Sequence, residues 1–434
     1  MHSLKTTKTD RRKETNMKKV LCLALAMVMA LSLCATAFAA NNASNIRGDK
    51  DYELQAQFSG ENAMLVDTRT FSDLSVSSTD AKNVMILAAN HLASMKNQIF
   101  DTCETLGFDK NVFLNMCVGT PFTVYSFDSN GNILSDDVHM CPLLYLGDVV
   151  GTIGVYYDAE SSSYCYSLGT TYALELNELF HSKKMDKRSG LVIGHLADKL
   201  FATDGRNTTI LFDEPSNGRA SVDVNEICDV CKAIRSSVSE NSFESFFSVS
   251  VSPTAEINAN TSSSSLLSVQ APNPLPIPPV YQGPGICGVA AWASVLNYRF
   301  GTRYDTPGLT SLMQRGNYTN GTDGKPCMTD YRDYANDKHN AGCTYLSSPP
   351  SFSKVTSAIG SNRPIMGCWC SGTGSDKDYH AIVITGYIKN SRTNYTYYVK
   401  NPWYDSATTI TVTSASNVVY VDGSYTWKLL NVVY

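Results

Sequence analysis

The first regular element that the hydrophobic pattern predicts along the chain is a helix. From Val84 to Leu106 apolar residues recur every three or four positions without a proline, and Ser78-Thr79-Asp80 offers an N-cap before them. Residues 121–127 then alternate between apolar and polar positions, which predicts a strand. The pattern further predicts strands within 143–157 and at 163–168, and short helices at 174–180 and 191–201. Residues 40–254 are therefore expected to form one α+β unit.

A change of composition separates this unit from a second one. Residues 255–280 hold a serine run and then alternating prolines, a pattern typical of an exposed, extended linker where proteolysis concentrates. Residues 288–300, apolar nearly all round their first half, predict a central buried helix. After a loop-rich stretch, strands are expected at 364–369, 381–387, 395–400, 408–413 and 425–430. A helix followed by an antiparallel sheet predicts an α+β domain over 281–434.

The N-terminal residues predict a targeting signal rather than a folded element. Residues 17–39 join two lysines, an apolar run and small residues ending in Ala37-Phe38-Ala39, which is typical of a cleaved signal peptide. We interpret residues 1–16 as an upstream extension, with Met17 as a candidate start. No later segment is long and apolar enough to span a bilayer. We therefore expect a secreted protein, extracellular or at the cell surface, without stable membrane insertion.

Composition and charge limit the classes of binding partner that we expect. The chain is 43% apolar and 17% charged, and its formal net charge is −5 without a dense basic run, which argues against nucleic acid as a partner. Thirteen cysteines less Cys22 and Cys34 of the signal leave eleven, an odd number that predicts at least one free thiol. Cys228 and Cys231 form a C-x-x-C without a redox or zinc context. Cys368 and Cys370 share one face of a strand and could pair with Cys327 or Cys343. We expect no metal and no cofactor.

The stretch YQGPGICGVAAWASVLNY, residues 281–298, is the candidate centre of chemistry. Cys287 lies where the apolar helix begins, and helix N–H groups and the helix dipole favour a thiolate there. The run Gly283-Pro284-Gly285 lets the backbone turn tightly. Gln282 can aim its amide at the same point as the Cys287 backbone N–H, and together they would form an oxyanion hole.

A cysteine nucleophile needs a base, and the base needs an orienting group. The second unit has two histidines. His339 lies in the polar stretch YANDKHNAGC, whereas His380 opens the apolar strand AIVITGY and can be held firmly beside a cleft. Asn401, after the strand YTYYVK, can accept the imidazole N–H, and Trp403 can shield that hydrogen bond from water. Asp405 is a weaker candidate for the orienting role.

These motifs, in the order YQGPGICG, RPIMGCW, YHAIVITGY and YYVKNPW, resemble the papain-like cysteine peptidases, and especially compact bacterial members of the staphopain and bacteriocin-leader-peptidase types. The resemblance implies Cys287 as nucleophile, His380 as base, Asn401 as third member and Gln282 in the oxyanion hole. Three departures put the plant-type subfamily in doubt. Gly288 replaces the tryptophan that follows the nucleophile, the second cysteine just upstream is absent, and Gln282 lies one residue nearer to the nucleophile. Residues 121–132, 141–158 and 173–180 faintly resemble staphopain-type pro-regions.

The resulting prediction is a secreted bacterial cysteine endopeptidase made as a zymogen. Residues 40–254 would be an inhibitory pro-domain, residues 255–280 the activation segment, and the partners a protein or peptide substrate and the chain's own pro-domain. Alternatives stay open: a Cys-His acyltransferase, a cell-wall amidase, or a dead papain-like scaffold that serves as a binding module. Each residue also has a structural reading: Cys287 as a packed thiol, His380 as a core histidine, Asn401 as a turn former, and Gln282 as a surface residue.

Overall fold

A computed structural model describes most of the chain from residue 78 onward. The described ranges are 78–119, 121–128, 133–181, 192–196, 199–203, 207–213, 274–282, 286–372, 377–390, 394–412, 414–423 and 425–434. The predicted signal peptide, the C-x-x-C pair and residues 255–273 of the predicted linker lie outside these ranges. The end of that linker, residues 274–280, is described, and Leu275 and Ile277 are buried in the hydrophobic core that contains Trp369, so the prediction of an exposed linker is wrong there.

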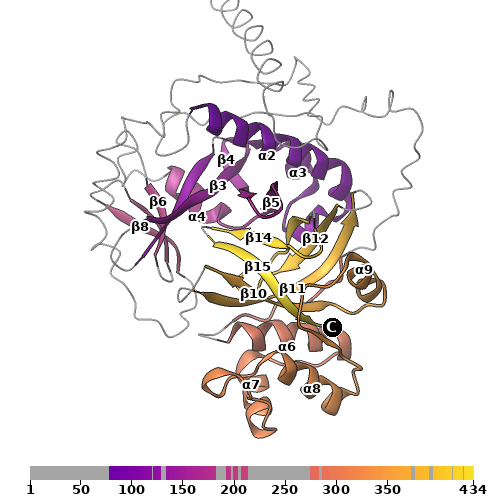
Figure 1. The fold of residues 1–434 in the computed structure, drawn as a ribbon. Helices are drawn as coiled ribbons and strands as arrows, with labels where there is room; N and C mark the ends of the chain where they lie inside the picture. Colours follow the sequence, from indigo (N-terminus) through magenta and orange to yellow (C-terminus); the bar gives the residue numbers. More distant parts are fainter. Residues whose placement is uncertain are drawn as a thin grey trace, which may run out of the picture.

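The described N-terminal segment, residues 78–213, is helical at first and then rich in strands (Figure 1). Its elements are α2 (Ser78–Ile99), η2 (Phe100–Leu106), α3 (Lys110–Asn115), β1 (Cys117–Val118), β2 (Phe122–Phe127), β3 (Ile133–Tyr145), β4 (Asp148–Asp158), β5 (Ser163–Gly169), α4 (Ala173–His181), β6 (Val192–Leu196), β7 (Lys199–Thr203) and β8 (Thr208–Asp213).

The described C-terminal segment, residues 274–434, begins with helices and ends with strands. Its elements are α6 (Cys287–Phe300), α7 (Thr306–Arg315), η6 (Thr322–Gly324), α8 (Met328–His339), β9 (Tyr345–Leu346), α9 (Phe352–Gly360), β10 (Ile365–Ser371), β11 (Asp378–Lys389), β12 (Tyr395–Lys400), β13 (Thr408–Val412), β14 (Val419–Asp422) and β15 (Tyr425–Val433).

One sheet runs through both segments. Its strands follow the order β14-β15-β10-β11-β12-β13-β5-β4-β3-β2-β6-β7-β8, with β1 on β3 and β9 on β15. The junction is the antiparallel pair β13–β5, where Thr409 lies opposite Leu168 and Ile410 opposite Ser167. The described strands thus join distant parts of the sequence in a mixed, mostly antiparallel sheet.

Helices cover the faces of this sheet. In β11 alternate residues point to opposite faces, as the period of a strand requires. Ala381 and Val383 pack in the core beneath α6, α7 and α8, while Ile382 and Ile384 pack in the core that α9 shares. Both faces of β11 are therefore buried, and Figure 1 shows α6, α7 and α8 together at one end of the molecule.

The N-terminal core extends into the C-terminal segment. Tyr398 of β12 and Ala407, just before β13, are buried with the side chains of α2, η2 and β4. The Tyr398 hydroxyl lies 2.7 Å from the Thr102 hydroxyl. These contacts tie the two segments together by packing as well as by strand pairing.

The structure confirms the mixed helix-and-sheet character that the pattern predicted, and it corrects some elements. The prediction of a helix at 191–201 is wrong, because Val192–Leu196 and Lys199–Thr203 form two strands of a hairpin. The stretch expected to be loop-rich contains α7, α8 and α9. That the first unit is a separate inhibitory domain stays a prediction.

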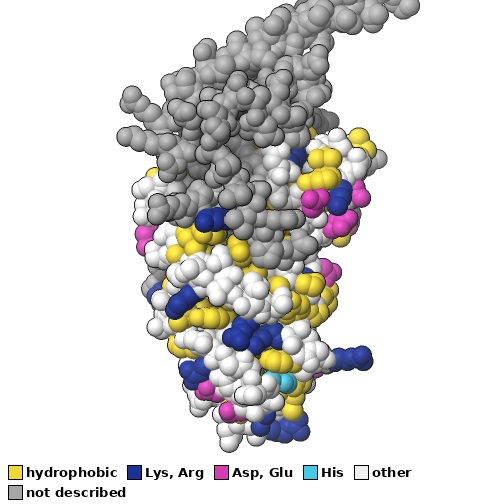
Figure 2. All heavy atoms as spheres, turned by 90° about the vertical axis from the view of Figure 1, so that its right-hand side faces the viewer, with side chains coloured by type: hydrophobic (Ala, Val, Ile, Leu, Met, Phe, Trp, Pro, Cys, Tyr) yellow, Lys and Arg dark blue, Asp and Glu magenta, His cyan; other side chains and the backbone are white. Residues whose placement is uncertain are grey.

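Surface charge and helix composition add two observations. On the face seen in Figure 2, Lys and Arg side chains are scattered among uncharged ones over the part of the chain that is described. Within the described ranges, the helices lack a stretch long and apolar enough to cross a membrane.

Candidate active site

The site begins at the N-terminus of α6, whose first residue is Cys287. The Cys287 side chain is half-buried. Burial raises the pKa of the thiol, while the backbone N–H groups of Ala381 and Gly288 act in the opposite direction. The thiol therefore lies beside the residue that follows His380, and at its own helix terminus it meets N–H groups that favour a thiolate.

The position after Cys287 has room only for glycine, because the Tyr331 ring lies close to it. A Cβ atom built on Gly288 would lie 2.3 Å from the Tyr331 hydroxyl oxygen. Tyr331, which is 4% exposed, belongs to α8 and packs in the core that contains Trp292. A larger residue after the nucleophile would collide with this ring, which explains why the tryptophan of the plant-type pattern is absent here.

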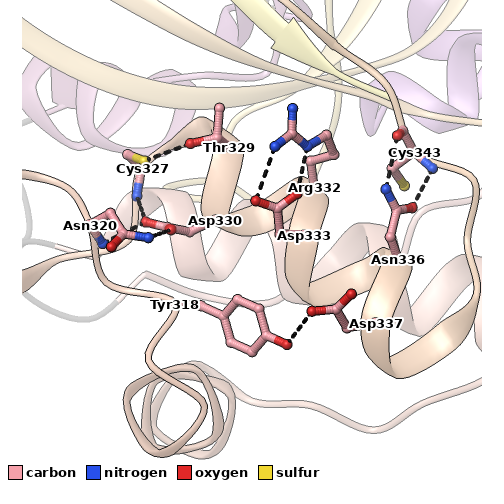
Figure 3. A network of polar contacts seen from close by, with 10 residues as sticks. All are labelled: Tyr318, Asn320, Cys327, Thr329, Asp330, Arg332, Asp333, Asn336, Asp337 and Cys343. Atoms are coloured by element: carbon pink, nitrogen blue, oxygen red, sulfur yellow. Dashed lines mark hydrogen bonds and ion pairs between the residues drawn. The ribbon is translucent and has the colours of Figure 1, made fainter.

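Polar contacts around Asp330 fix the first turn of α8, the helix that carries Tyr331 (Figure 3). The Asp330 carboxylate accepts hydrogen bonds from the backbone N–H groups of Asn320 and Cys327, each at 2.8 Å, and from the Asn320 side-chain amide. Burial alone would raise the pKa of Asp330, but these hydrogen bonds hold it below its ordinary value. The capped helix α8 begins at Met328. Its first turn places the Tyr331 ring against Gly288.

His380 lies near the start of β11 and is 3% exposed. Its Nε2 atom lies 2.8 Å from the Asn401 Oδ1 atom. The imidazole stacks on Trp403 with ring centroids 4.1 Å apart and packs against Trp427 at 5.3 Å. Burial lowers the pKa of His380 to about 4, although the hydrogen bond to Asn401 acts in the opposite direction. The ring is thus neutral at pH 7.

Asn401 directly follows β12 and is 2% exposed. Its Oδ1 atom accepts a hydrogen bond from the Trp403 backbone N–H at 3.0 Å, and its Nδ2 group donates to the Asp422 carboxylate at 3.0 Å. Because an amide oxygen can only accept, Nε2 of His380 carries the proton in this arrangement. The His380 Nδ1 atom is left as the basic nitrogen.

Gln282 lies next to the loop that carries Asn401. Its backbone N–H donates to the Pro402 carbonyl oxygen at 3.3 Å. The side chain is 8% exposed, and its buried amide atoms have no hydrogen-bond partner among the described residues. A buried amide without a partner is costly to keep, so its donor is available to a ligand. The glycines expected to shape this loop, 283 and 285, lie outside the described residues.

The two less favoured candidates, His339 and Asp405, lie in different places. His339 ends α8, where it stacks on Phe300 with centroids 4.8 Å apart and lies 3.3 Å from the Tyr304 hydroxyl. The exposed Asp405 carboxylate accepts a hydrogen bond from the Tyr281 hydroxyl. The structure therefore brings His380 to Asn401, whereas His339 belongs to an aromatic cluster and Asp405 faces Tyr281.

The cysteines expected to form disulfides are free where they are described. Cys327, Cys343, Cys368 and Cys370 are all unpaired thiols in the structure. Burial raises the pKa of Cys368 to about 12. The pairing suggested from the strand face of Cys368 and Cys370 is therefore absent from the described residues.

Sequence reasoning missed three neighbours of the site: Tyr331, Asp422 and Trp427. Asp422 lies in the stretch VVYVDGSYTW, where Asp-Gly ends one strand and begins a hairpin turn. The ordinary interpretation of such a pair is a turn. An acidic residue at the end of a fully apolar strand was the only sign of a buried polar role.

The comparisons with known proteins agree with this geometry at the level of a family. No curated protein matches the chain. Residues 274–426, which include Gln282, Cys287, His380 and Asn401, match the model of the Peptidase_C39 like family, and this match supports a cysteine peptidase-like domain over those residues.

Proposed function

We propose that the protein is a secreted cysteine endopeptidase, made as a zymogen and acting on protein or peptide substrates. The observation that carries the proposal is the 2.8 Å contact between His380 Nε2 and Asn401 Oδ1, in an imidazole stacked on Trp403. It fixes the tautomer that a cysteine peptidase needs, with the other ring nitrogen unprotonated. The family match over 274–426 supports cysteine peptidase activity in general.

The proposed reaction starts from two neutral groups. Burial raises the pKa of the Cys287 thiol and lowers that of His380, so at pH 7 the proton rests on sulfur. His380 accepts this proton as the sulfur attacks the peptide carbonyl carbon. The imidazolium then protonates the leaving amine, and water hydrolyses the thioester. Asn401 accepts the Nε2 proton throughout and keeps the ring from rotating.

The developing oxyanion needs donors placed before the reaction. The Gln282 side chain supplies one amide group, which is buried and without a partner among the described residues. The backbone N–H of Cys287, at the first position of α6, supplies the second. Their positions on either side of the Gly-Pro-Gly run support this assignment.

Contacts between the two described segments support a regulatory role for residues 40–254. Phe212 of β8 packs on Trp403 with centroids 6.1 Å apart, and His195 of β6 packs on Tyr425 at 4.4 Å. Trp403 is the residue that covers the imidazole of His380. An N-terminal segment that touches this tryptophan is well placed to hold a precursor latent until residues 255–280 are cut.

An intact-mass time course on residues 40–434 in mild reductant tests the proposal. Wild type is compared with Cys287→Ala, and Cys117→Ala serves as the control because Cys117 is also a half-buried cysteine. We expect wild type and the control to convert to a fragment beginning near residue 270, while Cys287→Ala stays whole. Conversion of all three would show that the linker is merely fragile.

If wild type stays whole, two further assays separate the alternatives. Labelling of Cys287 by a thiol-reactive epoxide at mildly acidic pH, with a peptide substrate cleaved, leaves the peptidase in place and assigns activation to another protease. Transfer to an added amine, in preference to hydrolysis, identifies an acyltransferase. A thiol that is never labelled identifies a binding module.

A further inference from the structure

Asp422 lies directly behind the proposed triad. It ends β14 and is 3% exposed. Its Oδ2 atom accepts hydrogen bonds from the Asn401 Nδ2 group at 3.0 Å and from the Tyr420 hydroxyl at 3.1 Å. Its Oδ1 atom accepts hydrogen bonds from the hydroxyls of Tyr172 at 3.0 Å and Tyr404 at 3.1 Å. A carboxylate so surrounded by donors is held at both oxygens and cannot rotate without losing several hydrogen bonds.

This arrangement decides which way the Asn401 amide points. The two ends of an amide have nearly the same shape but opposite hydrogen-bonding roles. An ionised carboxylate only accepts, so it binds the Nδ2 end of Asn401 and turns the Oδ1 end toward His380. A flipped amide would set its oxygen against the carboxylate and its NH₂ group against the imidazole Nε2 proton. Asp422 thereby also determines which nitrogen of His380 carries the proton.

The N-terminal segment takes part in this network. Tyr172 directly precedes α4 and is 5% exposed, and its hydroxyl lies 3.1 Å from that of Tyr404. A Cβ atom on Gly423, which has a φ of +58°, would lie 3.0 Å from the Tyr172 hydroxyl oxygen. The turn after Asp422 is therefore shaped to admit a tyrosine from a part of the chain about 250 residues away.

We propose that Asp422 is a positioning residue for catalysis, which sets the orientation of the Asn401 amide, and that Tyr172 anchors it from an N-terminal segment that stays bound after the linker is cut. The proposal rests on the proposed peptidase function for its kinetic consequence. At metal sites, loss of a group that orients a histidine ring from its far side costs about ten- to a hundredfold in activity, and we take the same range for Asp422. We expect a loss of this size in kcat for Asp422→Asn, with KM nearly unchanged, because Asp422 is buried behind Asn401.

The tautomer of His380 gives a test that does not require activity. In the Cys287→Ala background with ¹⁵N-labelled histidine, ring signals of His380 are assigned by their absence in His380→Gln. We expect the Nε2–H tautomer in the parent and a mixture of tautomers in Asp422→Asn, where either end of the new amide can face Asn401. An unchanged, pure Nε2–H tautomer in Asp422→Asn overturns the proposal.

A transposed pair keeps the test decisive if Asp422→Asn fails to fold. Asn401→Asp with Asp422→Asn exchanges the two side chains, keeps one negative charge, and leaves an acceptor facing His380. We expect this double variant to regain at least about tenfold in kcat over Asn401→Asp alone, in which two buried carboxylates face each other. Equal activity of the single and double variants contradicts the proposal.

The contribution of Tyr172 is measured against a matched control. Tyr172→Phe and Tyr420→Phe each remove one hydroxyl donor to Asp422, from different segments of the chain. We expect both to lower kcat by about threefold to tenfold, as for one hydrogen bond to a charged group. If Tyr420→Phe lowers kcat and Tyr172→Phe does not, the N-terminal anchor is wrong. If no variant has activity because wild type has none, the peptidase proposal fails while the tautomer test still decides the role of Asp422.

Discussion

Acid sensitivity of the fold follows from the burial of His380. Its pKa is about 4 in the folded protein, against 6.5 for the free side chain. The unfolded chain therefore binds a proton more readily than the folded one does at this site. The stabilisation from keeping His380 neutral is complete above pH 6.5 and is lost as the pH falls from 6.5 through 4.

The size of the effect comes from the same pair of values. Near pH 5 an unfolded His380 is almost fully protonated and a folded one is mostly neutral, which costs the folded state about 2 kcal/mol. His91 is a second case in a separate core: burial lowers its pKa to about 3, and its ring stacks on Tyr166 at 4.5 Å. By the same reasoning, burial of a neutral His91 costs the folded state about another 2 kcal/mol near pH 5.

Urea denaturation of the Cys287→Ala protein, followed by tryptophan fluorescence near pH 7.5 and near pH 5, measures these terms. His380→Gln should lose about 2 kcal/mol less stability between the two pH values than its parent, and His91→Gln should behave alike. The double variant should reduce the loss by about 4 kcal/mol, because the two rings lie in different cores and their effects add. A His380→Gln protein as acid-sensitive as its parent would refute the reasoning.

Three further predictions concern the site and its support. Gly288→Ala should lower the free energy of unfolding by about 1–3 kcal/mol because of the collision with Tyr331, and a second change, Tyr331→Phe, should restore part of it in urea denaturation; a Gly288→Ala protein of wild-type stability would show that the ring moves freely. Trp403→Ala should raise the pKa of His380 toward 6.5 because the stacked ring no longer buries it, which an NMR titration measures; an unchanged pKa would contradict this. After the linker is cut, the two fragments should co-elute in size-exclusion chromatography because Tyr398 stays buried in the N-terminal core; free C-terminal fragment would show that the shared sheet does not hold them.

Local pattern was sufficient for the elements closest to the chemistry. The apolar helix after Cys287, the strand that His380 opens and the strand before Asn401 were all predicted within a few residues of their bounds. Each is buried on most of its surface, so its sequence shows a long apolar run with clear ends. The hairpin at 192–203 was misread as a helix because short buried strands and buried helices share such runs.

The helices α7 and α8 were not predicted, because their sequences lack a long apolar run. They lie at the surface and carry many polar residues, so only a narrow stripe of each is apolar. Their ends are set by side chains such as Asp305 and Asp330, which cap the first turn. Capping signals without a strong apolar period are easily mistaken for loops.

The sequence by itself determined which side chains could do the chemistry. A single thiol at a helix start, a histidine opening a buried strand and an asparagine after the next strand were enough to name the residues proposed here. What only the tertiary structure decided was their support: Asp422 behind Asn401, Tyr331 against Gly288, and Tyr172 reaching Asp422 from the N-terminal segment. Such contacts join positions up to about 250 residues apart, and no local periodicity records them, because strand pairing and packing are settled only when the whole sheet forms.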